Sequence, residues 1–196
     1  MMIFLLFILF ILLSLSLLLI IARKGKFRKL AFAFRMGSVI LGIALFTYWF
    51  VEKSIDQYLK NSIALQLING LPQPIDFYII KVEKRSEDTR MLTEHLGKIR
   101  TDHFRLEYLK MAHSDEYWVA GYIGKNMVYF SDHYVPNKNM DQIVNVNNYV
   151  DMNENLSEKA KILVDEYKNQ NKGIAVWITM DLLLIFLNIG MLIRKR

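Results

Sequence analysis

Asp181 is the residue whose type and position point most directly to chemistry. It lies in a long apolar run, 173–193, and is 12 residues from the last residue of that run. At roughly 1.5 Å per helical residue, its carboxyl group would sit about 18 Å from that end, near the middle of a membrane-spanning helix. A carboxylate there costs on the order of 2.5–3.5 kcal/mol, so it normally contacts another protein group or lies on an ion path.

Other small or polar residues of the apolar runs are also expected to take part in helix packing. Trp177 and Asn188 lie on the helical face of Asp181, at offsets of −4 and +7. Small residues in the second apolar run permit close helix packing. The residues expected to pack helices, within the chain or against a partner, are therefore Asp181, Asn188, Trp177, Gly37, Ser38 and Gly42. A protonated Asp181, hydrogen-bonded to a neighbouring group, is the simpler alternative to a partner contact or an ion path.

The histidines and aromatic residues favour structural roles. The four histidines, at 95, 103, 113 and 133, lack the close ligand spacing of a helical zinc motif, so we expect surface histidines, no metal and no cofactor. No nucleophile elbow or phosphate-binding glycine loop is present in the sequence, which favours a non-enzymatic protein. The aromatic residues of 117–134 are expected to fill the core of a small sheet, with a ligand-binding face as the alternative.

Three apolar runs must position these residues. They cover 2–22, 30–51 and 173–193, each about 20 residues long, which at roughly 1.5 Å per residue spans a hydrocarbon core of about 30 Å. The first run has no basic residue before it and a basic cluster after it, the reverse of a signal peptide. We therefore expect three transmembrane helices, with Trp49 and Trp177 near the outer ends of the second and third.

Basic residues beside the runs predict the topology. Short loops rich in Lys and Arg stay in the cytoplasm, which places the loop 23–29 and the C-terminal tail inside. Residues 52–172 and the N-terminus are then extracytoplasmic. The residues expected to set topology and to contact lipid headgroups are Arg23, Lys24, Lys26, Arg28, Lys29, Arg35, Arg194, Lys195 and Arg196. Arg35 is only about five residues inside the second run, so we expect its side chain to reach the headgroups.

Charge and cysteine content narrow the function. The net charge of +6 comes from the membrane-flanking residues, because residues 52–172 hold 16 Lys and Arg against 18 Asp and Glu. A nucleic-acid partner is therefore not expected. The chain has no cysteine, which excludes disulfides and thiol nucleophiles. The richness in Ile, Lys, Asn and Phe is typical of bacterial coding, and the predicted location is the cell inner membrane.

The outer segment is predicted to be an α+β domain. Helical periodicity extends the second helix through Leu67, and a further helix is expected over 89–99. Strands are expected over 75–83, 103–111, 116–123 and 126–134, with a short strand over 142–146. Short linkers favour an antiparallel meander. A closing helix should start near Ser157 and lead into the third span, with a break allowed at 169–173.

The predicted fold is thus an α-helical membrane protein with three transmembrane helices and a small extracytoplasmic α+β domain, an antiparallel sheet flanked by helices. Its parts are a transmembrane hairpin (1–51), the outer domain (52–172), and a third helix with a basic tail (173–196). We expect an accessory or scaffold subunit of a membrane assembly, in contact with the bilayer and with membrane or periplasmic proteins, as a homo- or hetero-oligomer. The alternative is a ligand-sensing outer domain that signals through a separate membrane partner.

Overall fold

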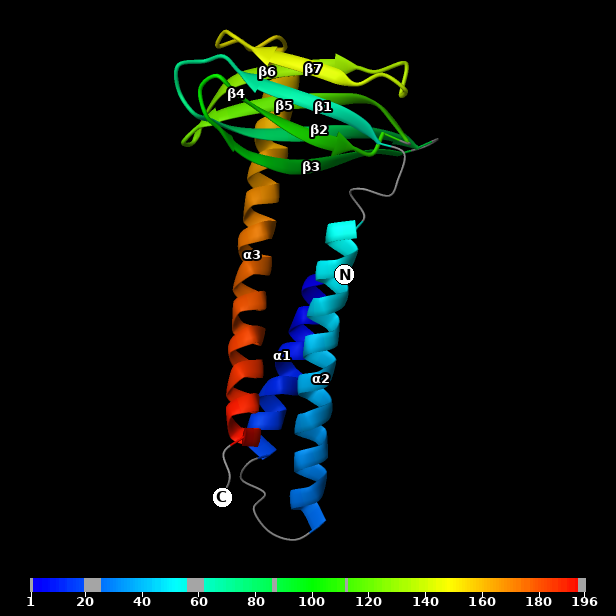
Figure 1. The fold of residues 1–196 in the computed structure, drawn as a ribbon, viewed down its shortest axis with the longest axis vertical. Helices are drawn as coiled ribbons and strands as arrows, with labels where there is room; N and C mark the ends of the chain where they lie inside the picture. The colour runs from blue at the N-terminus through cyan, green and yellow to red at the C-terminus, as the bar shows by residue number, and fades with distance from the viewer. Residues whose placement is uncertain (1, 20–25, 56–61, 86–87, 112, 194–196) are drawn as a thin grey trace. The chain divides into compact units, whose positions relative to one another are not determined.

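The chain divides into a helical unit and a strand-rich unit. The computed structural model describes residues 2–19, 26–55, 62–85, 88–111 and 113–193. The helical unit is Met1–Ile55 with Asn169–Arg196, and the strand-rich unit is Asp56–Lys168. Figure 1 labels the elements of both. Of the basic residues expected to set topology, Arg23, Lys24 and 194–196 lie outside the described residues.

The helical unit contains α1 (Met2–Leu18), α2 (Lys26–Ile55) and the second half of α3 (Glu154–Ile193). Among the described residues, α2 and α3 are long and apolar enough to cross a membrane, whereas α1 has 17 residues. Two of the three expected spans therefore reach full length. The buried core of the unit joins all three helices through Leu9, Leu13, Val39 and Ile185.

The strand-rich unit is a sandwich of two sheets. Its strands are β1 (Ile63–Asn69), β2 (Ile75–Arg85), β3 (Asp88–Ile99), β4 (His103–Leu109), β5 (Ser114–Ile123), β6 (Asn126–Tyr134) and β7 (Gln142–Val146). One sheet has the order β4-β1-β7 and the other β3-β2-β5-β6. All pairings of these strands are antiparallel except that of β1 with β7. The single antiparallel sheet expected from the sequence was wrong, because the chain leaves the meander after β3 to build a second layer.

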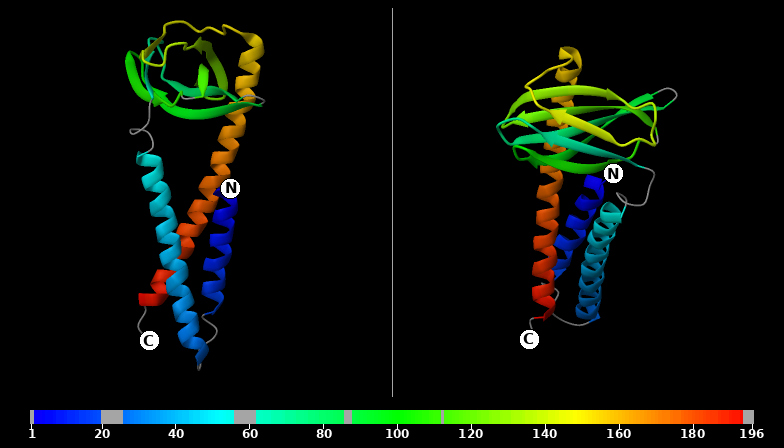
Figure 2. Two further views of the ribbon diagram at one scale, coloured as in Figure 1. Left: turned by 90° about the vertical axis from the view of Figure 1, so that its right-hand side faces the viewer. Right: turned by 45° about the horizontal axis from the view of Figure 1, so that its top comes forward.

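Two apolar layers hold the sandwich together. Alternate residues of β1, such as Leu65 and Leu67, are buried and pack between the sheets with Phe77 and Ile79 of β2. The opposite face of the four-stranded sheet packs against the first turns of α3. Trp118, on this face, lies in one buried cluster with residues of α3. Figure 2 shows this part of α3 running along the sheet. The four-stranded sheet is thus covered on both faces, as its aromatic content requires.

Two predicted helices are strands instead. Helix α2 is described to Ile55, residues 56–61 of its expected extension lie outside the described residues, and Ile63–Leu67 belong to β1 instead. The segment 89–99 is β3, paired along its whole length with β2. Leu92, Leu96 and Ile99 fit helical spacing, so the local pattern favoured a helix, and pairing with β2 overrode it.

The closing helix is longer than expected. It begins at Glu154, because Asn153 Oδ1 accepts a hydrogen bond from the backbone N–H of Leu156 at 3.2 Å, the geometry of a helix N-cap. Ser157, expected near the start, instead donates from Oγ to Asp151 Oδ2 at 2.5 Å. The helix continues without interruption through 169–173, where a break was allowed, to Ile193.

Candidate functional site

The predicted polar stripe of α3 faces α1. Trp177 makes edge-to-face contacts with Phe7 and Phe10, at ring-centroid distances of 5.6 and 5.5 Å. Asn188 is fully buried, and its Oδ1 accepts a hydrogen bond of 2.6 Å from Ser16 Oγ. Its Nδ2 donates to the carbonyl oxygens of Leu13 and Leu184, at 3.2 and 2.8 Å. Two of the residues predicted on this stripe therefore form an intrachain seam.

Arg35 joins this seam from α2. Its Nη2 donates to the carbonyl oxygen of Ser16 at 3.2 Å, and its side chain is buried. Its guanidinium group thus lies against α1, near the end of that helix, and contact of Arg35 with lipid headgroups stays a prediction. We call Ser16, Arg35 and Asn188 the Ser16 cluster, since Arg35 and Asn188 both contact Ser16. It joins three helices through polar contacts beside the apolar core of the unit.

Asp181 lies apart from the Ser16 cluster. Its side chain is fully buried, and neither carboxyl oxygen has a hydrogen-bond partner among the described residues. Asn188 is seven residues away on the same helix, a separation of about 10 Å along the axis. Burial of a carboxyl group without a partner is costly. The structure therefore does not bring Asp181 together with the polar residues predicted beside it.

The predicted small-residue surface of α2 divides in two. A Cβ added at Gly42 would lie 2.8 Å from Ile185 Cδ1 and 3.6 Å from Leu9 Cδ1, so this glycine lets all three helices approach. A Cβ added at Gly37 would meet nothing within 4 Å. Ser38 is buried, and its Oγ donates to the carbonyl oxygen of Phe34 in its own helix at 2.9 Å.

A second candidate site was not predicted: an exposed apolar surface on the three-stranded sheet. Phe104, Leu106 and Tyr108 of β4 are 63%, 47% and 41% exposed, and Ile143 of β7 is 63% exposed. Leu106 and Ile143 are both paired with Gln66, so they lie in one cross-strand row. We call these four residues the outer face. At roughly 200 Å² for a large side chain, they present about 400 Å², within the ~300–600 Å² typical of functional surface patches.

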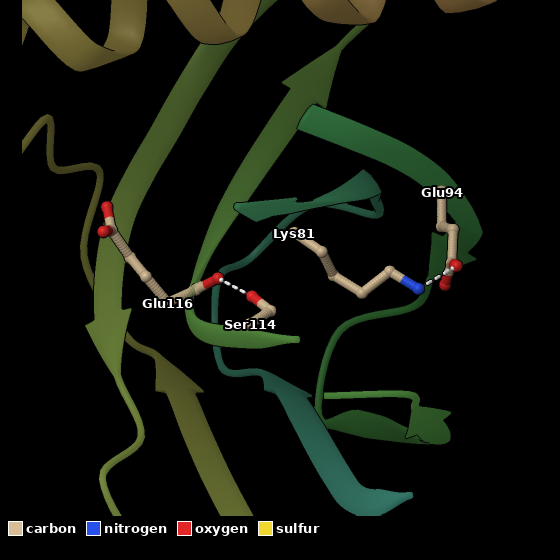
Figure 3. Close-up of polar contacts among 4 residues, drawn as sticks. All are labelled: Lys81, Glu94, Ser114 and Glu116. Carbon is tan, nitrogen blue, oxygen red and sulfur yellow. Dashed lines mark hydrogen bonds and ion pairs between the residues drawn. The ribbon is translucent and has the colours of Figure 1, made fainter. Parts of the chain in front are cut away.

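Charged residues explain why β4 presents apolar side chains outward. Lys81 of β2 is buried and ion-paired with Glu94 of β3 (Figure 3). On β4, Arg105 Nε lies 3.8 Å from Glu107 Oε2, and the Arg105 guanidinium occupies the space beside Gly97. Burial raises the pKa of Glu107; Arg105 opposes this effect and Glu94 adds to it. The charged residues of β4 thus point toward the other sheet, and its apolar residues point away.

Figure 3 also shows Ser114, the first residue of β5, which pairs with β2. Ser114 Oγ lies 2.8 Å from the carbonyl oxygen of Glu116, the contact drawn in Figure 3. It also lies 2.7 Å from the carbonyl oxygen of Val82. The register of β2 and β5 shifts at this point, between Val82 and Glu83. The serine hydroxyl therefore compensates for a local interruption of the backbone ladder.

The histidines make separate contacts from one another, and most aromatic residues of 117–134 are buried. His95 Nε2 lies 2.7 Å from Asp76 Oδ1, whereas His103 Nδ1 lies 2.7 Å from the carbonyl oxygen of Thr101. His133 stacks on the buried Tyr117 at a centroid distance of 5.0 Å, and burial lowers its pKa. The expectation that the aromatic residues of 117–134 fill the core is confirmed for Tyr117, Trp118, Tyr122, Tyr129 and Phe130, whereas Tyr134 is exposed.

The sequence carried one signal for the outer face. Phe104, Leu106 and Tyr108 alternate with Arg105 and Glu107, but alternation alone does not say which side of a strand is buried. Leu109 shares the side of the charged residues and is buried, which identifies the inner side. Comparison with protein-family models, with curated proteins and with solved structures gives no match to this chain.

Proposed function

We propose that this chain is a non-enzymatic accessory or scaffold subunit of a membrane protein assembly, with its strand-rich unit outside the cytoplasm. The outer face carries this proposal. About 400 Å² of exposed apolar surface gathered on one face, with Gln66 between Leu106 and Ile143, is more than scattered exposed residues explain. It approaches half of the roughly 800 Å² that each partner buries in a standard interface. A membrane or periplasmic protein that covers Phe104, Leu106 and Ile143 would remove this surface from water.

The contacts of the helical unit support three spans. Phe7 contacts Trp177, and further along both helices Ser16 contacts Asn188, so α1 and α3 run in the same direction. Arg35 contacts Ser16 on α1, whereas Gly42, further along α2, adjoins Leu9, so α2 runs in the opposite direction to α1. Consecutive membrane spans must alternate in this way. The 17 residues of α1 are at the lower end of the ~17–25 that a span requires.

The docking proposal is tested with the full chain in mild detergent. The change Phe104→Ser with Ile143→Ser removes two large side chains from the outer face. Tyr149→Ser with Met152→Ser is the matched control, because these large side chains are also exposed, at 49% and 62%, but lie between β7 and α3. We expect the wild type and the control to purify with a stoichiometric partner and the outer-face variant to lose it. A wild-type chain that purifies alone contradicts the proposal.

The topology is tested by cysteine labelling, since the chain has no cysteine of its own. Cysteine is placed at Asn137, in the exposed loop before β7, or at the exposed Lys29 near the start of α2. A membrane-impermeant maleimide should label position 137 in intact spheroplasts and should label position 29 only after lysis. Labelling of position 29 in intact spheroplasts contradicts the orientation, and it does so independently of the docking test.

A sensor remains the second candidate, and the continuity of α3 favours it. One uninterrupted helix carries residues packed on the four-stranded sheet, such as Val164, and residues packed on α1, such as Asn188. A ligand that changed sheet packing would act on the same helix that joins α1. The test is thermal unfolding of the full chain against a metabolite panel. A rise in Tm that depends on ligand concentration favours a sensor, and an unchanged Tm across the panel argues against it.

A further inference from the structure

Strand β4 is an edge strand that is exposed along most of its length. Among the described strands it pairs only with β1, and the pairing continues from His103 to Leu109 without a register shift. Its first four residues and Tyr108 are exposed, and Glu107 is partly buried. Proteins usually protect the edge of a sheet with proline, a bulge, a covering segment or inward-pointing charges, and β4 carries such charges in Arg105 and Glu107. The sequence of β4 contains no proline.

The central residues of β4, 104–108, are complementary to themselves when reversed about Leu106. Phe104 and Tyr108 are equally distant from Leu106, and so are the oppositely charged Arg105 and Glu107. One step beyond the ends of the strand, Asp102 and Lys110 are also equally distant and oppositely charged. A strand with this pattern can pair antiparallel with its own copy and place aromatic opposite aromatic and acid opposite base.

We propose that β4 pairs antiparallel with β4 of a second copy of this chain, about a two-fold axis at Leu106. The pairing joins the three-stranded sheets of two copies edge to edge. Each Arg105 then lies opposite the Glu107 of the other copy, and the interface is isologous, as two-fold symmetry requires. The inference goes beyond the proposed function, because it concerns the edge of the strand and does not depend on what covers the outer face.

The charges select this register and no neighbouring one. Two-fold symmetry keeps the outer faces of both sheets on the same side. Outward-pointing side chains must therefore stay opposite outward-pointing ones, so the register can change only by moving the axis from one residue to another. Centring the pair on Arg105 places two arginines directly opposite each other. Centring it on Glu107 places two glutamates opposite each other. Like charges directly opposite are destabilising, so the Leu106-centred register is the one in which the charges attract.

Disulfide trapping tests the pairing in the full chain in native membranes. Directly opposite residues in an antiparallel pair have Cα atoms about 4.5 or 5.5 Å apart, within the ~4.4–6.8 Å that a disulfide spans. The change Leu106→Cys introduces a single thiol in a cysteine-free chain, so any covalent dimer must join two copies at this position. Ile143→Cys is the matched control, because it is at least as exposed but lies on β7, at the opposite edge of the same sheet.

Under mild oxidation we expect L106C to form a covalent dimer and I143C to remain monomeric. Equal yields from both variants would show random collision and would overturn the proposal. A disulfide between L106C and a different protein would report the partner proposed to cover the outer face, whereas absence of an L106C homodimer would overturn the pairing of β4 with its copy. The trapping yield is read separately from the partner recovery that tests the proposed function, so one result can fail while the other holds.

Charge reversal in the L106C background tests the register. Arg105→Glu alone and Glu107→Arg alone each place like charges opposite each other, and we expect each to weaken dimerisation on the order of tenfold. The double change R105E with E107R restores opposite charges and should restore the yield. Circular dichroism checks that each variant keeps its folded structure. A folded double variant that stays as weak as the single variants contradicts the Leu106-centred register.

Discussion

The buried Lys81 and its partly exposed partner Glu94 should respond to mutation in opposite ways. The Lys81 side chain is 6% exposed and that of Glu94 is 46% exposed, so the ammonium group depends on its partner far more than the carboxylate does. Glu94→Ala leaves a buried positive charge without this partner. Lys81→Met removes the charge and keeps an apolar side chain of similar length in the same space.

The magnitudes follow from these exposures. Loss of one member of a fully buried ion pair costs about 3–5 kcal/mol. Because water reaches Glu94, and exposed pairs are worth only about 0–1 kcal/mol, we expect Glu94→Ala to lower the free energy of unfolding of the strand-rich unit by about 1.5–3 kcal/mol. Replacement of a buried charge by a well-packed apolar group is often neutral. We therefore expect Lys81→Met to remain within about 1 kcal/mol of the wild type.

Hydrogen exchange with mass spectrometry on the full chain measures this effect locally. Peptides from β2 and β3 report on the strands that carry the pair, and peptides from α1 show how far the effect extends into the helical unit. Since each factor of ten in protection corresponds to about 1.4 kcal/mol, Glu94→Ala should accelerate exchange in β2 and β3 by roughly 10- to 100-fold. The double variant with Lys81→Met should recover most of this loss.

Two results would refute the reasoning. If Lys81→Met destabilises the sheet as much as Glu94→Ala does, the ion pair is a net source of stability and the cost of burying the charge has been overstated. If Glu94→Ala leaves exchange unchanged, another group compensates the ammonium. In either case, the difference in exposure between Lys81 and Glu94 does not determine how the two mutations change stability.

Further predictions concern packing, pH and an unpaired hydroxyl. Gly42→Leu should disrupt the helical unit, whereas Gly37→Leu should leave it intact, as measured by thermal unfolding in detergent, because only Gly42 adjoins Ile185. Because the pKa of His133 is lowered in the folded state, the unfolded state binds more protons below about pH 6.5. The free energy of unfolding should therefore fall as pH decreases from there through the folded-state pKa. His133→Asn should reduce this pH dependence, as measured by urea titrations. Tyr117→Phe should raise the free energy of unfolding by up to about 1 kcal/mol, because it removes a buried hydroxyl without a hydrogen-bond partner among the described residues.

Each of these predictions has a contradicting outcome. Equal loss of stability in both glycine variants would place the helix contact elsewhere on α2. An acid dependence that persists unchanged without His133 would assign it to other groups. A destabilising Tyr117→Phe would indicate that an ordered water satisfies the hydroxyl.

Local sequence patterns predicted much of the strand-rich unit. The strands over 126–134 and 142–146 have the predicted bounds, and β2, β4 and β5 differ from theirs by two residues at one end. The segment 89–99 could not be assigned in the same way, because Leu92, Leu96 and Ile99 fit helical spacing and its pairing with β2 is set by residues distant in sequence. The division into two sheets is equally non-local, since β1 pairs with β4 and β7.

The candidate site was predicted in part for the same reason. The helical face of Trp177 and Asn188 follows from spacing, but the contact of that face with α1 depends on how three helices pack. Arg35 was judged by its distance from the end of an apolar run, which does not reveal that Ser16 offers it a carbonyl oxygen. The outer face required knowledge of which side of β4 is covered.

The uninterrupted α3 has a consequence for how the protein folds. Its residues 169–172 are exposed yet helical, between one stretch that packs on the four-stranded sheet and another that packs on α1. Starting a helix is costly, whereas extending one adds a hydrogen bond for each residue fixed. Whichever half of α3 forms first therefore lowers the nucleation cost for the other half. The two units should melt with shared cooperativity, and a proline at position 170 should separate their transitions.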